Sequence, residues 1–339
     1  MAETVGGTME SSVINAASGQ GRRPYFDNAR YLLMFLVVIG HFIDLPSLME
    51  PGAPSRAVLF WIYFLHMPGM ALISGFFAKG EPLSRVPGRL AVRLLAPYVV
   101  FQLAYAIALG KPLGFHEPYY LMWYSMSLFS WHVLLPLAKR LWNPLVWAVA
   151  VGLLAGYVPQ IGSTLSLSRT LAFFPFFLAG YCLEERHFVW LAGRRREAVV
   201  SLSILGVVAW GLSGANPLWM NFADSYAVLG VPHWWAASIR FAQYVAAAIG
   251  CAAFFALVPS RTVWFSAMGT RTMYVYLWHG LILIVGRRVG LESFGLWAVV
   301  GAGCVTTLLL GSALVQRLTR WVVEPLWLLP SPPSQCAPT

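Results

Sequence analysis

The residues of this sequence best suited to chemistry are histidines that lie inside long apolar stretches. Arg30 and His41 are eleven positions apart in the first such stretch. A helix would place their side chains within about 20° of each other around its axis and about 16 Å apart along it. One helix face would therefore carry a cation at its cytoplasmic edge and an imidazole near mid-membrane.

Two further histidines fall at comparable positions. His66 lies about nine residues from the outer end of the second apolar stretch, and His279 about seven residues into the ninth. At 1.5 Å per residue these side chains would lie roughly 14 Å and 10 Å deep. We expect three histidines from three helices to converge in the inner and middle part of a membrane. Ionisable groups there are costly and point to function, although a single histidine can also serve only as a hydrogen bond between helices.

A neutral imidazole at this depth suits acyl transfer. It can take the proton from a hydroxyl while that oxygen attacks an acyl group, because the imidazole pKa lies close to the operating pH. Arg30 is too far from His41 to share that step, but an arginine suits the phosphates of a long donor that reaches in from the cytosol. The arrangement fits acyl-CoA, whose thioester is well removed from its nucleotide. We do not expect a metal site, since the spans lack mid-span acidic residues and an HExxH or His-x-x-His pattern.

The elements that position these residues follow from the composition. The 339 residues are 58% hydrophobic and 11% charged, with a mean hydropathy of +0.66, whereas soluble domains are about a quarter charged. A water-soluble surface cannot be built from this composition. We predict a disordered cytoplasmic tail over 1–23, one membrane domain over 24–329, and a cytoplasmic C-terminal tail over 330–339.

Apolar stretches long enough to cross a bilayer recur along this domain. We predict an all-α polytopic membrane protein with about ten transmembrane helices in one bundle, near 31–50, 57–78, 92–110, 120–138, 144–160, 170–184, 197–213, 238–258, 272–286 and 295–316. Most of the 23 basic residues fall on the cytoplasmic side if the N-terminus is inside. This distribution places both termini in the cytoplasm and the protein in the cell membrane, and it accounts for the net charge without a nucleic-acid partner.

An ordered set of motifs resembles the acyltransferase 3 family of membrane acyltransferases, and within it the branch similar to fucose 4-O-acetylases. The resemblance covers about residues 24–325 and consists of Arg30 and His41 as the Arg-x10-His signature, 64–77 (FLHMPGMALISGFF), the basic run Arg85, Arg89 and Arg93 before Pro97 and Tyr98, 122–136 (MWYSMSLFSWHVLLP), and 274–280 (YVYLWHG).

The resemblance implies a ten-span fold and transfer of an acyl group, commonly acetyl, from acyl-CoA to a hydroxyl of a carbohydrate or another small acceptor. His41 matches the family's essential histidine, the expected base, and Arg30 would bind the donor. His66 and His279 are carried over by motif match, with less defined roles such as acceptor orientation. The expected partners are acyl-CoA, the hydroxyl acceptor and the lipid bilayer, and no tightly bound cofactor is expected.

Several residues have two open interpretations. Asp44, three residues after His41, could orient the imidazole or merely mark the helix end ahead of a proline. Arg89 and Arg93 could bind CoA phosphates or lipid headgroups, or reflect only the positive-inside distribution. Trp123 and Tyr124 could line the acceptor path, although aromatic residues at a span end are usually interfacial.

The rival hypothesis is a proton-coupled secondary transporter in which the intramembrane histidines relay protons. Transporters often contain paired repeats with interrupted helices at matching positions. No such pair is evident in the sequence, so the enzyme is the favoured hypothesis.

Overall fold

The computed structural model describes residues 23–80, 86–230 and 233–325, and all regular structure in these segments is helical. Of the two expected tails, only Arg23 falls within the described residues. The α-helices are α2 (Pro24–Ile43), α3 (Pro54–Tyr63), α4 (His66–Phe77), α5 (Val86–Leu109), α6 (Trp123–Ala138), α7 (Pro144–Leu154), α8 (Leu167–Cys182), α9 (Glu185–Ala192), α10 (Arg195–Gly211), α11 (Leu218–Asn221), α12 (His233–Leu257), α13 (Thr272–Arg288), α14 (Leu296–Leu310) and α15 (Ala313–Val323). Short 3-10 helices are η1 (Pro46–Leu48), η2 (Ala78–Gly80), η3 (Ala155–Tyr157), η4 (Thr164–Ser166), η5 (Ser266–Arg271) and η6 (Leu291–Phe294).

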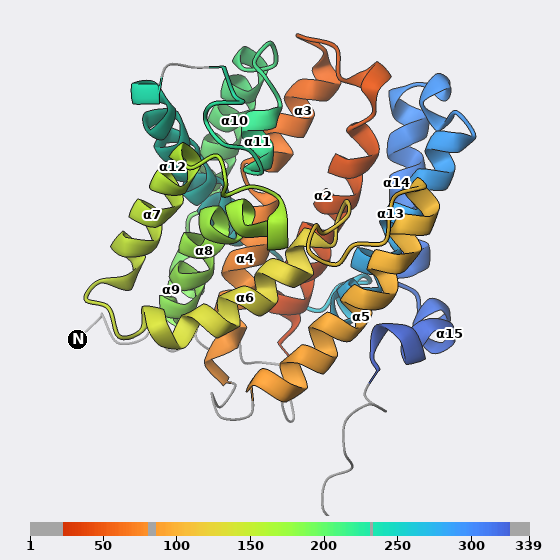
Figure 1. Cartoon of the computed structure of the whole chain (residues 1–339), viewed down its shortest axis with the longest axis horizontal. Helices are drawn as coiled ribbons and strands as arrows, with labels where there is room; N and C mark the ends of the chain where they lie inside the picture. Colours follow the sequence, from red (N-terminus) through yellow and green to blue (C-terminus); the bar gives the residue numbers. More distant parts are fainter. Residues whose placement is uncertain (1–22, 81–85, 231–232, 326–339) are drawn as a thin grey trace, which may run out of the picture.

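Helix α2 lies inside the bundle, in contact with α3, α4, α13 and α14 (Figure 1). It starts at Pro24 because proline suits the first helical position, where its missing N–H has no partner to lose. It ends at Ile43, three residues before Pro46, whose ring disfavours helical geometry in the residue before it. The helix therefore occupies Pro24–Ile43 instead of the expected 31–50, which places His41 in its last turn.

Every predicted apolar stretch contains a helix, but the number of membrane crossings is smaller by length. Within the described segments, five helices are long and apolar enough to cross a membrane: Pro24–Ile43, Pro54–Phe77, Leu90–Leu109, Thr164–Cys182 and Trp234–Leu257. A sixth results if Leu296–Leu310 and Ala313–Val323, which are bent by 73°, form one span. The expected count of about ten is therefore not confirmed.

The remaining predicted spans are short helices. α6, α7, α10 and α13 contain 16, 11, 17 and 17 residues. Even 17 residues rise only about 26 Å, slightly less than the roughly 30 Å thickness of a bilayer core. These helices could cross only with help from flanking residues or local thinning of the bilayer.

Helices α4 and α8 pack against each other with their backbones in contact. A Cβ atom at Gly75 would overlap the carbonyl oxygen of Phe177, and one at Gly180 would overlap the carbonyl oxygen of Leu72. Glycine is therefore required on both helices for this approach, as is common where membrane helices pack closely. The contact fixes the positions of α4, which begins at His66, and α8, which carries Arg169 in its first turn.

Candidate functional site

The last turn of α2 and the middle of α13 meet through two imidazoles. His41 Nδ1 lies 3.1 Å from His279 Nε2, and the rings stack with centroids 5.3 Å apart and planes 15° apart. His279 is fully buried. Its Nδ1 lies 2.8 Å from the carbonyl oxygen of Val275, one helical turn earlier.

These contacts determine which ring nitrogens carry protons in the neutral histidines. A carbonyl oxygen only accepts hydrogen bonds, so His279 Nδ1 donates to Val275 and His279 Nε2 keeps its lone pair. That lone pair accepts the hydrogen bond donated by His41 Nδ1. His41 Nε2 is therefore the unprotonated nitrogen of its ring and is the atom available to take a proton.

His66 shows the same pattern at the start of α4. Its Nδ1 donates to the carbonyl oxygen of Ile62, 2.9 Å away, which again leaves Nε2 with the lone pair. The side chain is buried and its ring centroid lies 4.7 Å from that of Tyr63. The structure thus brings the three histidines together: His41 and His279 in contact, and His66 in the wall of a cavity that His41 also lines.

This cavity, called the Asp44 cavity below, has a volume of about 150 Å³. Its polar lining consists of His41, Asp44, Tyr63, His66, Tyr120, Arg169 and Asn221. Across the described part of the chain, neither the Asp44 carboxylate nor the hydroxyls of Tyr63 and Tyr120 have a hydrogen-bond partner. Trp123 and Phe173, whose rings stack 5.4 Å apart, add an aromatic wall. The cavity therefore offers an unusual density of free hydrogen-bonding groups beside two aromatic faces.

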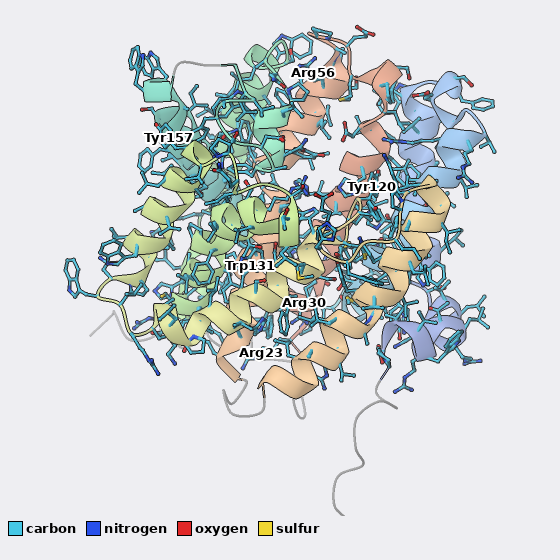
Figure 2. The ribbon with its side chains drawn as sticks, viewed as in Figure 1. Arg23, Arg30, Arg56, Tyr120, Trp131 and Tyr157 are labelled. Carbon is cyan, nitrogen blue, oxygen red and sulfur yellow. The ribbon has the colours of Figure 1, made fainter. Side chains whose placement is uncertain are left out.

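A second cavity of about 270 Å³, the Arg30 cavity, lies toward the amino end of α2. Arg30 and Ser74 contribute to its lining, together with Phe77, Tyr124 and His132. The Arg30 guanidinium lies 4.0 Å from the centre of the Phe77 ring, a cation–π distance, and its Nη1 lies 3.8 Å from Asp27 Oδ1. Figure 2 shows Arg30 in the lower half of the bundle and Tyr120, from the Asp44 cavity, above it.

A narrow space of about 10 Å³ lies between the two cavities. It shares Met34, Met70, Tyr124 and Tyr276 with the Arg30 cavity, and His41, Met67, Leu121 and Trp123 with the Asp44 cavity. His41 therefore stands where the connection opens into the Asp44 cavity, and a group entering from the Arg30 side reaches His41 through a constriction.

A model described as an acyltransferase domain, of the acyltransferase 3 type, matches residues 23–316. The chain belongs to the acyltransferase 3 family. No curated protein and no solved structure matches it. The protein is therefore an acyltransferase with membrane-type helices. The match lends no support to the transporter hypothesis, and the branch similar to fucose 4-O-acetylases is not confirmed.

In this acyltransferase 3 protein, the predicted orienting contact of Asp44 is made by another residue. Among the described residues, the side-chain partner of His41 is His279, and no hydrogen bond joins Asp44 to the imidazole. Asp44 caps the end of α2, and its carbonyl oxygen accepts a hydrogen bond from Arg287 Nη2 at 2.7 Å. Burial raises the pKa of the Asp44 carboxyl, while the Arg287 charge acts in the opposite direction.

The two predicted basic partners of the donor are only partly described. Arg93 lines a space of about 310 Å³ that also includes Glu324 and shares Leu94 and Met273 with the Arg30 cavity. The side chain of Arg89 lies outside the described residues, as does Arg85. Binding of the donor by Arg30, Arg89 and Arg93 stays a prediction.

Sequence reasoning did not single out Tyr63, Tyr120 and Arg169 as site residues of the acyltransferase. Arg169 carried a signal, because it is an arginine near the start of an apolar span where the positive-inside rule does not explain it. Trp123 and Tyr124 are buried between the cavities and are not interfacial anchors. Across the described segments, no group of three or more histidine, cysteine or acidic residues could hold a metal ion.

Proposed function

We propose that this acyltransferase moves an acyl group, most simply acetyl, from acyl-CoA to a hydroxyl of a carbohydrate or another small acceptor. The observation that carries the proposal is the position of His41, which lines both the Asp44 cavity and the narrow space next to the Arg30 cavity, two cavities with different linings.

The Arg30 cavity suits the donor. Arg30 supplies a planar cation for phosphate oxygens, and its contact with Phe77 holds that cation in place. Arg93 lies in the adjoining space and would add a second charge. The methionines beyond Arg30 form an apolar passage for the pantetheine arm, and the distance of about 16 Å from Arg30 to His41 separates nucleotide from thioester.

The Asp44 cavity suits an acceptor with several hydroxyl groups. Such an acceptor both donates and accepts hydrogen bonds, and the carboxylate, phenols and imidazoles of the cavity supply partners of both kinds. The aromatic wall of Trp123 and Phe173 can cover an apolar face of a sugar ring. His66 Nε2 would accept a hydrogen bond from one acceptor hydroxyl and so orient another toward His41.

In the proposed transfer step, His41 carries a proton from the acceptor hydroxyl to the leaving sulfur. The acceptor hydroxyl gives its proton to His41 Nε2, and its oxygen forms a bond to the thioester carbonyl carbon. The carbon–sulfur bond breaks, and the leaving thiolate takes from His41 the proton that the acceptor hydroxyl gave up, which yields free CoA and the ester. The hydrogen bond from His41 Nδ1 to His279 keeps the imidazole in the required tautomer throughout and stabilises its charged form.

We further propose that the ten helical stretches cross the cell membrane with both termini in the cytoplasm. The donor would then enter from the cytoplasm through the Arg30 cavity. The acceptor would enter from the opposite face, near Asp44. Basic residues concentrated at the Arg30 end support this orientation.

A thiol-release assay on the protein in lipid nanodiscs tests the proposed function. Acetyl-CoA and a panel of sugars are supplied, and free CoA and ester are measured for the wild type, His41→Ala and His41→Gln. Loss of the base should lower the rate by about 1,000-fold or more. His116→Ala, which removes an exposed histidine outside both cavities, should keep the wild-type rate. Full activity of His41→Ala in folded protein would refute the assignment.

The transporter hypothesis predicts a different result in sealed vesicles. Labelled sugar would cross the membrane without CoA release, and removal of acetyl-CoA would not affect it. The proposed enzyme requires acetyl-CoA for every labelled product.

A further inference from the structure

Arg169, in the first turn of α8, lines the Asp44 cavity but takes no part in the proposed transfer step. Its Nε donates to the carbonyl oxygen of Asn221, 3.1 Å away, and its guanidinium carbon lies 5.1 Å from the Trp123 ring centre. The preceding residue, Ser168, donates from Oγ to the carbonyl oxygen of Phe222 at 2.8 Å. Two consecutive residues thus bind the backbone at the C-terminal end of α11, at Asn221 and Phe222.

The bond to Asn221 uses only one of the five N–H groups of the guanidinium. Within the described part of the chain, the two terminal nitrogens of Arg169 have no hydrogen bond and no carboxylate within ion-pair distance. Asp224 attracts the Arg169 charge only from farther away. Arg169 is partly buried in the cavity wall, and a partly desolvated cation without a close counter-ion is costly. An anion bound beside it would supply the counter-charge that no neighbouring carboxylate supplies.

The other charge in the cavity does not cancel this one. Asp44 is coupled electrostatically to Arg287, which also bonds its carbonyl oxygen. Within the described residues, no ion pair or hydrogen bond joins Arg169 to Asp44. The cation of Arg169 is therefore available at its own part of the cavity.

We propose that Arg169 binds an anionic group of the acceptor, a carboxylate or a phosphate, and so selects acidic acceptors over neutral ones. The inference rests on the proposed function, because it names the acceptor class of the same cavity. Arginine binds both anions through two parallel N–H···O hydrogen bonds. The Nε bond to Asn221 and the contact with the Trp123 ring restrict the orientation of the Arg169 guanidinium plane. With the anionic group of the acceptor bound at Arg169, the distance between this group and the reacting hydroxyl of the acceptor would determine whether the hydroxyl reaches His41.

A purely structural role for Arg169 makes a different prediction, because Ser168 offers a matched control. Ser168→Ala removes the neighbouring bond to the same loop but no cavity cation. If Arg169 only held the loop, both substitutions would weaken every acceptor alike. If it binds an anion, only Arg169→Gln removes the preference for acidic acceptors.

The experiment measures binding in nanodiscs without acyl-CoA, by calorimetry, for methyl glucoside, methyl glucuronide and glucose 1-phosphate. We expect the wild type to bind at least one of the two anions about 10- to 100-fold more tightly than the neutral glucoside. Arg169→Gln should abolish that advantage and leave glucoside binding unchanged, Arg169→Lys should keep part of it, and Ser168→Ala should keep it. Comparison of the two anions distinguishes a carboxylate site from a phosphate site, and melting temperatures confirm that each variant is folded.

Equal binding of all three compounds by the wild type, or equal loss of all three in Arg169→Gln, would overturn the inference. So would a loss of anion preference in Ser168→Ala as large as in Arg169→Gln. Because no acyl-CoA is present, the result is independent of transfer. A protein that binds anions through Arg169 but releases no CoA with any acceptor would keep the anion site and lose the proposed function.

Discussion

His41 Nδ1 and His279 Nε2 lie 3.1 Å apart although the two residues are 238 positions apart in the chain. The carbonyl oxygen of Val275 occupies the other nitrogen of His279, so this ring can only accept from His41 when it is neutral. The pair therefore fixes the lone pair of His41 on Nε2, the nitrogen left for the acceptor hydroxyl. In the proposed mechanism, His279 positions the base and does not contact the acyl group.

Replacement of His279 tests this positioning role. His279→Ala leaves His41 Nδ1 without its partner, so we expect kcat to fall about 100-fold or more with little change in KM. The amide of His279→Gln can place an oxygen near the position of Nε2, and this variant should retain more activity than the alanine variant. Steady-state kinetics in nanodiscs measure both. Equal activity of the alanine variant and the wild type would show that His41 needs no partner.

A prediction for the donor concerns Arg30. Arg30→Gln removes the cation of its cavity while Phe77 remains, so KM for acetyl-CoA should rise about 10- to 100-fold while KM for the acceptor stays constant. Arg23→Gln is the matched control, because Arg23 lies outside the cavity and pairs with Glu185.

A truncated donor without the nucleotide tests whether Arg30 contacts the phosphates. Acetyl-pantetheine carries the thioester but no nucleotide, so its KM should not respond to Arg30→Gln. An equal rise for acetyl-CoA and acetyl-pantetheine would mean that Arg30 does not contact the phosphates and acts on the cavity as a whole.

The constriction between the cavities predicts a limit on acyl length. Met70 lines both the constriction and the Arg30 cavity, and the constriction holds only about 10 Å³. Met70→Ala should raise the rate with butyryl-CoA relative to acetyl-CoA by about 10-fold, the scale of discrimination that one or two methylenes give in an apolar pocket. Competition assays with the two thioesters measure the ratio.

A methionine away from the constriction controls for loosened packing. Met126 packs against the main core and lines neither cavity nor the connection. Met126→Ala should lose stability, by less than the about 2–5 kcal/mol of a fully buried core truncation because Met126 is partly buried, without a change in the ratio. A shift in both variants would attribute the effect to general loosening.

The sequence predicted the helical class and a helix in each long apolar stretch, because such stretches have few other folded forms in a membrane. It did not predict the short helices α9 and α11, which lie between those stretches. Its count of about ten crossings is not confirmed, since hydropathy cannot show where a stretch bends, as between Leu310 and Ala313. It also missed the helix ends next to Pro24 and Pro46.

The candidate site was predictable only where single helices carry it. Spacing within α2 gave Arg30 and His41, and depth gave the approximate level of His66. The contact of His41 with His279 and the cavity shared with Arg169 depend on how distant helices pack, which one sequence does not contain. Tyr120 could not be predicted as a site residue for another reason. It lies in a loop with a backbone φ of 51°, outside any periodic pattern.

Helix packing behind the site yields a last prediction, on Gly75. A methyl group there would overlap the carbonyl oxygen of Phe177, and backbone cannot move aside as a flexible side chain can. Gly75→Ala should therefore separate α4 from α8, lower the melting temperature and displace His66 and Arg169 together. In contrast, Gly301 in α14 has open space around it, and Gly301→Ala should be neutral or stabilising by up to about 1 kcal/mol, the difference in helix propensity. Thermal unfolding in nanodiscs measures both. If Gly75→Ala melts like the wild type, the close contact of α4 and α8 is not what holds this side of the cavity.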